Sequence, residues 1–214
     1  ARASAAEAGS AAMAGAALAK KEEEAAKAEQ AFAKADLDAL KEVRDGLRKQ
    51  DPEMIKKGME RLENSMAQEG TLIANVTNLL SKSDTILKAQ ETAVRGMPTT
   101  DDDEKKAKAE AQSLVREIKE IKKQLEKVES SATASFQEMR NGYGEVQDLM
   151  SGETSKQDLG KMMEIVTSME AAVEHRQETS KLVKRLAKDL RRRENKLLQL
   201  LGKRGKVRGL WGAR

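Results

Sequence analysis

Residues 111–150 read AQSLVREIKEIKKQLEKVESSATASFQEMRNGYGEVQDLM, and apolar side chains recur in this stretch at spacings of three and four. The alternation places them along one stripe of a long helix, as in coiled coils. Two successive spacings of four around Ala132 form a stutter, which predicts local unwinding of a left-handed supercoil. The stripe consists of Ala111, Leu114, Ile118, Ile121, Leu125, Val128, Ala132, Phe136, Met139, Tyr143, Val146 and Met150.

A second stripe precedes it, over residues 52–97. Asp51 is a favoured N-cap, and Pro52 has the backbone angle of a first helical residue. The polar residues Glu69, Ser83 and Gln90 occupy three stripe positions. The apolar positions are Ile55, Met59, Leu62, Met66, Ile73, Val76, Leu80, Leu87, Val94 and Met97. This pattern predicts a second helix of similar length.

A third stripe follows, over residues 156–201. Ser155 and Asp158 resemble a capping box at its start, and Arg176 and Ser180 interrupt it. Glycines alternate with basic residues beyond Leu201, so we expect the helix to end there. The apolar positions are Met162, Val166, Met169, Val173, Val183, Ala187, Leu190, Leu197 and Leu201.

The first segment, residues 11–50, is rich in alanine. Its bulky apolar residues are Leu18, Phe32, Leu37, Leu40, Val43 and Leu47. They are too sparse to decide whether this segment packs as a fourth helix or forms a detached arm.

These segments predict an all-α fold, an elongated antiparallel helical bundle or coiled coil of three to four long helices with a basic irregular C-terminal tail. We expect turns near residues 50–52, 97–101 and 151–155. Thr100 is the expected cap of the helix after the second turn, and the glycines in Asn141–Gly144 predict a kink or break. The predicted domains are an Ala-rich N-terminal helix or arm (1–50), a three-helix body (51–201) and a Gly/Arg tail containing Trp211 (202–214).

Charge is distributed unevenly along the chain. Residues 181–214 hold 13 Lys and Arg against two acids, a net charge of +11, whereas the whole chain carries +4 and the remainder therefore −7. A basic end predicts an acidic partner surface. Trp211 lies among glycines and arginines, with nothing of its own to bury against, which predicts an anchor inserted into the partner. The candidate partner-binding residues are Lys184, Arg185, Lys188, Arg191, Arg192, Arg193, Lys203, Arg204, Lys206, Arg208, Leu210, Trp211 and Arg214.

No catalytic, cofactor-binding or metal-binding pattern is recognisable. The chain has no cysteine, and its one histidine, His175, has only helix-surface neighbours in the sequence. The acidic runs at 22–24 and 101–104 are typical of solvated faces and helix caps. The methionines fall mainly on stripe positions, which indicates core packing. We therefore expect neither an enzyme nor a cofactor.

The sequence favours a structural or linker subunit of a larger protein complex, docked through its basic C-terminal end on an acidic protein surface. A nucleic-acid-binding component of a ribonucleoprotein is a second interpretation, although no aromatic platform accompanies the charge. A module bound to an anionic membrane surface is a third, and no stretch is apolar enough to span a membrane. The alanine-rich start indicates an organelle (plastid or mitochondrion) after removal of a transit peptide, with the cytoplasm as the alternative.

Overall fold

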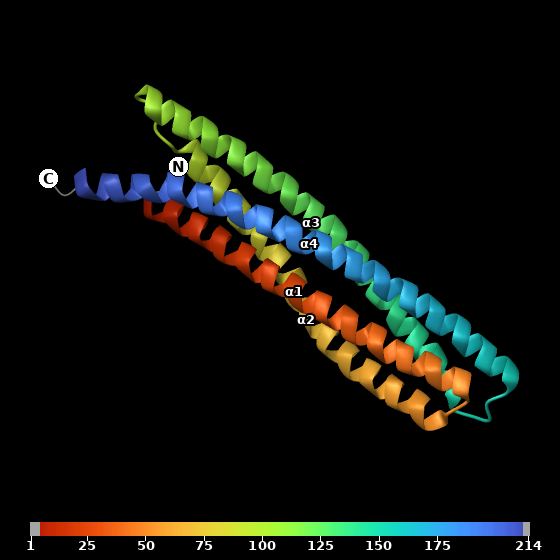
Figure 1. Cartoon of the computed structure of the whole chain (residues 1–214). Helices are drawn as coiled ribbons and strands as arrows, with labels where there is room; N and C mark the ends of the chain where they lie inside the picture. The colour runs from red at the N-terminus through yellow and green to blue at the C-terminus, as the bar shows by residue number, and fades with distance from the viewer. Residues whose placement is uncertain (1–4, 212–214) are drawn as a thin grey trace. The chain divides into compact units, whose positions relative to one another are not determined.

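The computed structural model describes residues 5–211, and the side chains of residues 7–201. Four helices follow one another: α1 (Ala5–Lys49), α2 (Pro52–Arg95), α3 (Asp102–Met150) and α4 (Lys156–Trp211) (Figure 1). Within this part of the chain there is no β-strand. The predicted all-α helical bundle and its three turns are confirmed.

The chain forms two compact units, and each takes one segment from every helix. Unit 1 contains residues 1–24, 76–127 and 184–214, and unit 2 contains residues 25–75 and 128–183. Each is a bundle of four helical segments, so α1 packs as a fourth helix rather than as a detached arm. The units cut through the helices, and the domain boundaries predicted at residues 50 and 201 remain a prediction.

The turn between α1 and α2 is closed by backbone hydrogen bonds. The amide of Asp51 donates to the carbonyl of Gly46 at 2.9 Å and that of Gln50 to Leu47 at 3.3 Å, the pattern of a Schellman motif. Gln50 has a φ of 52°, the left-handed conformation that this motif requires. The Asp51 carboxylate then accepts the amide of Met54 at 3.3 Å, which confirms Asp51 as the N-cap of α2.

The caps of α3 and α4 differ in how well they were predicted. Asp101, not Thr100, caps α3, because its carboxylate accepts the Glu104 amide at 2.7 Å. Glu104 reaches back to the Thr100 amide at 2.8 Å, so Thr100 lies just outside the helix. At α4 the capping box is confirmed: Ser155 and Asp158 exchange hydrogen bonds of 3.1 Å in both directions.

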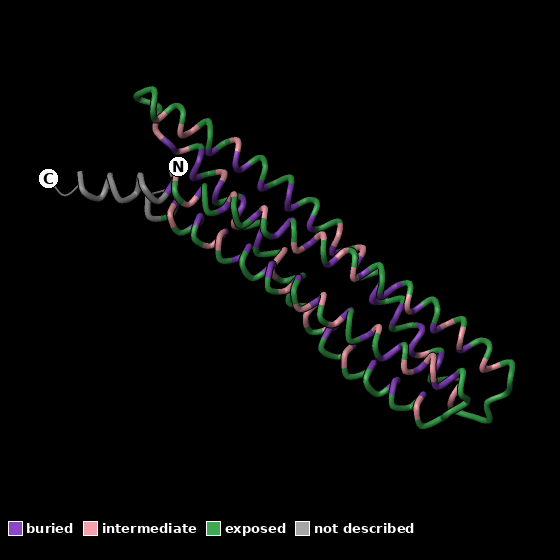
Figure 2. The backbone as a smooth tube through the Cα atoms, in the orientation of Figure 1, coloured by how far each residue is buried: buried purple, intermediate pink, exposed green. Residues whose placement is uncertain are grey.

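The predicted stripes of α2, α3 and α4 are the buried faces of these helices (Figure 2). Their polar positions are buried as well, since Glu69, Ser83, Gln90, Arg176 and Ser180 are each less than a tenth exposed. These residues therefore continue the stripes instead of interrupting them. In α4, Glu194 extends the same spacing between Leu190 and Leu197.

Helix α1 has a complete stripe that its bulky residues did not reveal. Twelve positions alternate at spacings of four and three, and all are buried. They are Ala8, Ala12, Gly15, Ala19, Glu22, Ala26, Glu29, Ala33, Asp36, Leu40, Val43 and Leu47. Until Leu40 the stripe consists of small and acidic residues only, while the expected anchors Phe32 and Leu37 are half-buried.

The buried face of α3 does not require the predicted stutter. Val115, Lys122 and Glu129 are buried alongside their neighbours Leu114 and Ile121. Spacings of four and three continue without a break through these three residues to Ala132 and beyond. The apolar residues at 114, 121 and 128 concealed this second path because two of its members are charged.

Two helix breaks predicted at glycines are absent. Helix α3 continues through Gly142 and Gly144 to Met150, and α4 continues past Leu201 to Trp211, so the tail is not irregular over 202–211. Glycine costs a helix about 1 kcal/mol each, too little to end one that is already propagating. Gly142 has a packing role, because a Cβ there would lie 2.5 Å from Cγ of Met169 in unit 2.

The two glycines of α3 predict opposite effects of the same substitution. Gly144→Ala meets nothing within 4 Å, so it should raise the free energy of unfolding by about 0.5–1 kcal/mol through helix propensity alone. Gly142→Ala forces Met169 aside and should lower it by about 1–3 kcal/mol. Urea denaturation of both variants measures the difference. Equal effects would show that α3 and α4 do not approach closely at Gly142.

Candidate functional site

The core of unit 2 contains a charged layer centred on Arg176 of α4. Its guanidinium lies 3.0 Å from the Glu69 carboxylate of α2 and 3.5 Å from the Asp36 carboxylate of α1. The guanidinium carbon also lies 5.3 Å from the centre of the Phe136 ring of α3. Arg176 is 4% exposed, and Asp36 and Glu69 are fully buried. All four helices therefore contribute to one dry layer.

Asp36 is short of hydrogen-bond partners in this layer. Neither of its oxygens makes a hydrogen bond of good geometry. Oε1 of Glu69 and the Ser65 hydroxyl oxygen are likewise buried without one. Burial, with the Glu69 carboxylate beside it, raises the pKa of Asp36 to about 9. A proton on Asp36 supplies the missing donor, so we infer that Asp36 is protonated at neutral pH.

A second acid pair in unit 2 joins α1 to α3. Glu29 and Glu129 are both buried, and burial together with the Glu129 carboxylate raises the pKa of Glu29 to about 8. Among the described side chains of unit 2, the buried charged groups are thus four carboxyls and one guanidinium. Arg176 faces Glu29, Asp36 and Glu69 together, and one cation cannot neutralise three carboxylates, so we infer that protons supply part of the balance.

Unit 1 contains a buried polar contact between α2 and α4. The Gln90 side-chain amide donates to the Glu194 carboxylate at 2.6 Å and to the Ala11 carbonyl of α1 at 3.4 Å. Gly15 of α1 provides the space, because a Cβ there would overlap both the Glu194 carboxylate and the Gln90 amide. Burial raises the pKa of Glu194 to about 7.

The α1 stripe contains three acids, and Glu22, the first along the chain, is the one that lies in unit 1. Both of its oxygens are buried without a hydrogen-bond partner. Burial, and then the charge of Glu194, raise the pKa of Glu22 to about 7, while Lys122 opposes the shift. Lys122 of α3 is itself buried and forms an ion pair with Asp84 of α2, whose pKa it lowers. Glu22 thus lacks a cation of its own.

The basic end of α4 separates into two groups of residues. Arg191 and Arg193 hold the unit together, with ion pairs to Glu23 at 3.3 Å and Glu117 at 2.9 Å. An exposed row lies on the opposite side of the helix from its buried stripe, with spacings of three and four residues. This outward row consists of Arg185, Lys188, Arg192 and Lys196.

Two other residues predicted to contact a partner are less available than the rest of the outward row. Lys184 is half-buried, and Arg192 pairs at 2.6 Å with Asp189 of its own helix. The side chains of Lys203, Arg204, Lys206, Arg208, Leu210 and Trp211 lie outside the described part, and so does residue Arg214. Their role in partner binding remains a prediction.

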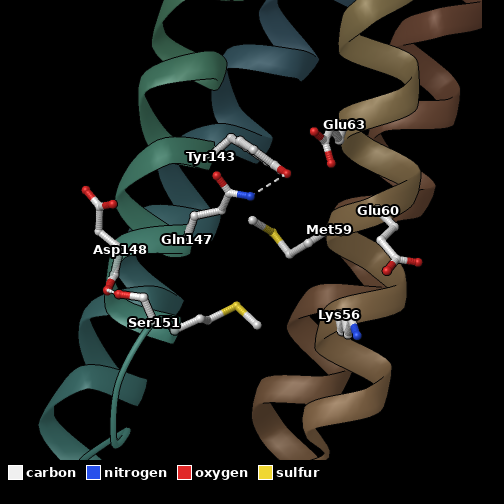
Figure 3. A pocket seen from close by; sticks show the side chains of 9 residues that line it. Lys56, Met59, Glu60, Glu63, Tyr143, Gln147, Asp148 and Ser151 are labelled. Carbon is white, nitrogen blue, oxygen red and sulfur yellow. Dashed lines mark hydrogen bonds between the residues drawn. The ribbon is translucent and has the colours of Figure 1, made fainter.

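Two other places in unit 2 bring polar side chains of different helices together. His175 lies 2.8 Å from the Ser131 hydroxyl, and the contact is exposed. A groove of about 570 Å³ in unit 2 lies between α2 and α3, where Met59 and Tyr143 face one another (Figure 3). Gln147 donates to the Tyr143 hydroxyl at 2.9 Å. Burial and the nearby Glu63 raise the pKa of Tyr143 to about 12, which keeps the phenol protonated at neutral pH.

The described residues contain no group of three His, Cys, Asp or Glu side chains placed to hold a metal ion. No described helix is long and apolar enough to cross a membrane.

Removing the guanidinium of Arg176 should strongly destabilise the protein. Arg176→Met leaves Glu69 and Asp36 buried beside each other without a cation, and we expect the free energy of unfolding to fall by about 3–5 kcal/mol. Adding Asp36→Asn and Glu69→Gln removes the stranded carboxyls and should restore most of this loss. Urea denaturation of the single and triple variants tests the pair of expectations; a triple variant as unstable as Arg176→Met would contradict them.

The raised pKa values predict that stability falls as pH rises. A group with a raised folded-state pKa makes the folded chain bind more protons than the unfolded chain, so the free energy of unfolding declines as pH increases. The window runs from the ordinary 4.5 to about 7 for Glu22 and Glu194, from 4.5 to about 8 for Glu29, and from 3.8 to about 9 for Asp36. Urea midpoints measured across this range should decrease steadily. Replacing Glu22, Glu29 and Asp36 together by their amides should flatten the profile, whereas Glu24→Gln with Asp38→Asn, two exposed acids of α1, should not.

Comparison with known proteins yields no similar family model, curated protein or solved structure.

Proposed function

We propose that this protein is a non-enzymatic structural or linker subunit of a larger assembly, which docks through the basic C-terminal end of α4 on an acidic protein surface. The observation that supports the proposal is the outward row. Arg185, Lys188 and Lys196 are exposed and make no ion pair with the described side chains. Surface charges usually occur with both signs interspersed, so a row of one sign is available for a partner.

The two faces of α4 explain how one helix performs both tasks. The stripe containing Val183, Ala187, Leu190 and Leu197 is buried in unit 1 and fixes the rotation of the helix. Arg191 and Arg193 at the flanks reach back to α1 and α3. The outward row is therefore held in a set orientation before a partner arrives, which reduces the entropy lost on binding.

An acidic protein surface fits the row better than the alternatives do. Among the described side chains of α4 in unit 1, Leu186, Leu190, Leu197 and Leu201 are buried in the core, so a membrane would meet charge there without a large apolar face to insert. No aromatic side chain lies on the described part of α4 before Trp211, so stacking on bases has no platform there. Nucleic-acid binding and membrane binding are consequently treated as alternative outcomes of the test.

The test is a purification of the protein from its native source with a matched pair of variants. Arg185→Gln, Lys188→Gln and Lys196→Gln together neutralise the outward row, and Lys57→Gln, Lys82→Gln and Lys123→Gln neutralise three exposed lysines elsewhere. We expect acidic proteins to be retained by the wild type and by the control after nuclease and detergent treatment. The row variant should lose about tenfold in retention at low salt, since each surface pair contributes up to about 1 kcal/mol.

Three results would contradict the proposal. Loss of all retained material after nuclease treatment would favour the nucleic-acid alternative, and loss after detergent would favour the membrane alternative. An equal loss from the row variant and the control would show that only net charge matters.

A further inference from the structure

From the pairing of buried acids across the bundle we propose that α1 is a proton-held latch, whose segment before Leu40 separates from the other helices when the buried acids of its stripe lose their protons. The latch would make the closed bundle a state of mildly acidic to neutral pH. The proposal is independent of the basic row on α4.

Helix α1 contributes one acid to each of the three buried acid pairs. Residues 22, 29 and 36 of α1 are spaced by seven and all lie on its buried stripe. Each meets an acid of another helix: in unit 1, Glu22 is affected by the charge of Glu194 of α4. In unit 2, Glu29 meets Glu129 of α3 and Asp36 meets Glu69 of α2. Loss of these protons therefore creates repulsion between α1 and each of its neighbours.

Two cations, Arg176 and Lys122, face these acids and could relieve the repulsion. In unit 2, Arg176 faces both Asp36 and Glu29 but already binds Glu69 at 3.0 Å. In unit 1, Lys122 faces Glu22 but is paired with Asp84, and Gln90 donates its amide to Glu194. Each cation is thus engaged with a neighbouring acid, and ionised Glu22, Glu29 and Asp36 would remain undercompensated in the dry core.

The stripe of α1 before Leu40 makes few apolar contacts with the other helices, because its residues are small or acidic. Alanine buries no side-chain carbon beyond Cβ, and in unit 2 Ala26 and Ala33 fill the stripe positions of α1 that precede Glu29 and Asp36. From Leu40 onward the stripe consists of Leu40, Val43 and Leu47, which belong to the main apolar cluster of that unit. We therefore expect the C-terminal end of α1 to stay packed while the segment before it moves.

The other three helices lose less when α1 moves. Their stripes contain large apolar residues throughout unit 2, among them Leu62, Met139, Met162, Val166 and Met169, which are almost completely buried. These residues contact one another in the same cluster. A local opening confined to α1 is consequently less costly than unfolding of the unit.

The test measures distances between spin labels in unit 2 as a function of pH. Because the chain has no cysteine, labels can be placed at Ala31→Cys on α1 and Glu174→Cys on α4, both exposed positions. Asn64→Cys with Glu174→Cys provides a matched α2–α4 pair. Double electron–electron resonance should give one narrow α1–α4 distribution at about pH 6 that broadens and lengthens by about pH 9.5, whereas the α2–α4 distribution stays unchanged.

Amide variants identify the acids responsible. With Glu29→Gln and Asp36→Asn, α1 should remain closed at both pH values, because amides of the same shape cannot ionise. The control Glu24→Gln with Asp38→Asn, on the exposed side of α1, should open as the wild type does. An α1–α4 distribution that is unchanged in the wild type up to about pH 9.5 would overturn the proposal. So would equal broadening of the α2–α4 pair, or opening of the amide variant at the wild-type pH.

Discussion

The structure depends on neutralising a few charges inside a narrow helical bundle. Arg176 is the one buried cation of unit 2 among the described side chains, and it lies within reach of three carboxyls from α1 and α2. Its position on the stripe of α4 means that the packing register and the charge balance are the same problem. Sliding one helix past another by a turn would separate Arg176 from Glu69 and leave both charges buried. Such a layer restricts the alignment of the helices even where it contributes little net stability.

The small residues of α1 make room for the buried charged and polar side chains. A carboxyl group in a bundle core needs space, and alanine or glycine at neighbouring stripe positions supplies it. Gly15 shows the relation directly, since the Glu194 carboxylate and the Gln90 amide occupy the volume that a Cβ would fill. The consequence is that the stripe of α1 has little apolar area until Leu40, and the larger apolar residues before it lie beside the stripe, with Leu18 buried and Phe32 and Leu37 half-buried. Its attachment therefore depends on the protonation of its acids to a degree that the other helices do not share.

Helix α4 divides its described basic residues between the inside and the outside of the protein. Some of its positive charge is used internally, through Arg176 in the core of unit 2 and through Arg191 and Arg193 at the edges of unit 1. The four residues of the outward row are turned to solvent. Counting charges along the chain cannot separate these two groups, because they alternate within the same turns of helix. The separation follows from which side of the helix is buried.

The sequence by itself determined the four helices, most of their ends and the buried faces of α2, α3 and α4. Apolar spacing is a local property, and the caps at Asp51 and Ser155 involve residues three apart, so both can be seen without the fold. The cap of α3 was predicted at Thr100, one residue before the observed cap Asp101. Both residue types are good caps, and the choice between them depends on the geometry of the preceding turn.

Only the tertiary structure decided that α1 packs against the other helices and that the polar stripe residues pair with one another. Alanine occurs on both exposed and buried helix faces, so alanines spaced by seven in α1 indicate a buried face only weakly. The buried stripe becomes visible when Glu22, Glu29 and Asp36 are included in it. The partners of these acids lie on other helices, as do Glu69 of α2 and Arg176 of α4, which are 107 residues apart. Whether a buried polar residue is a flaw or a constraint depends on what faces it, and that is known only once the helices are packed together.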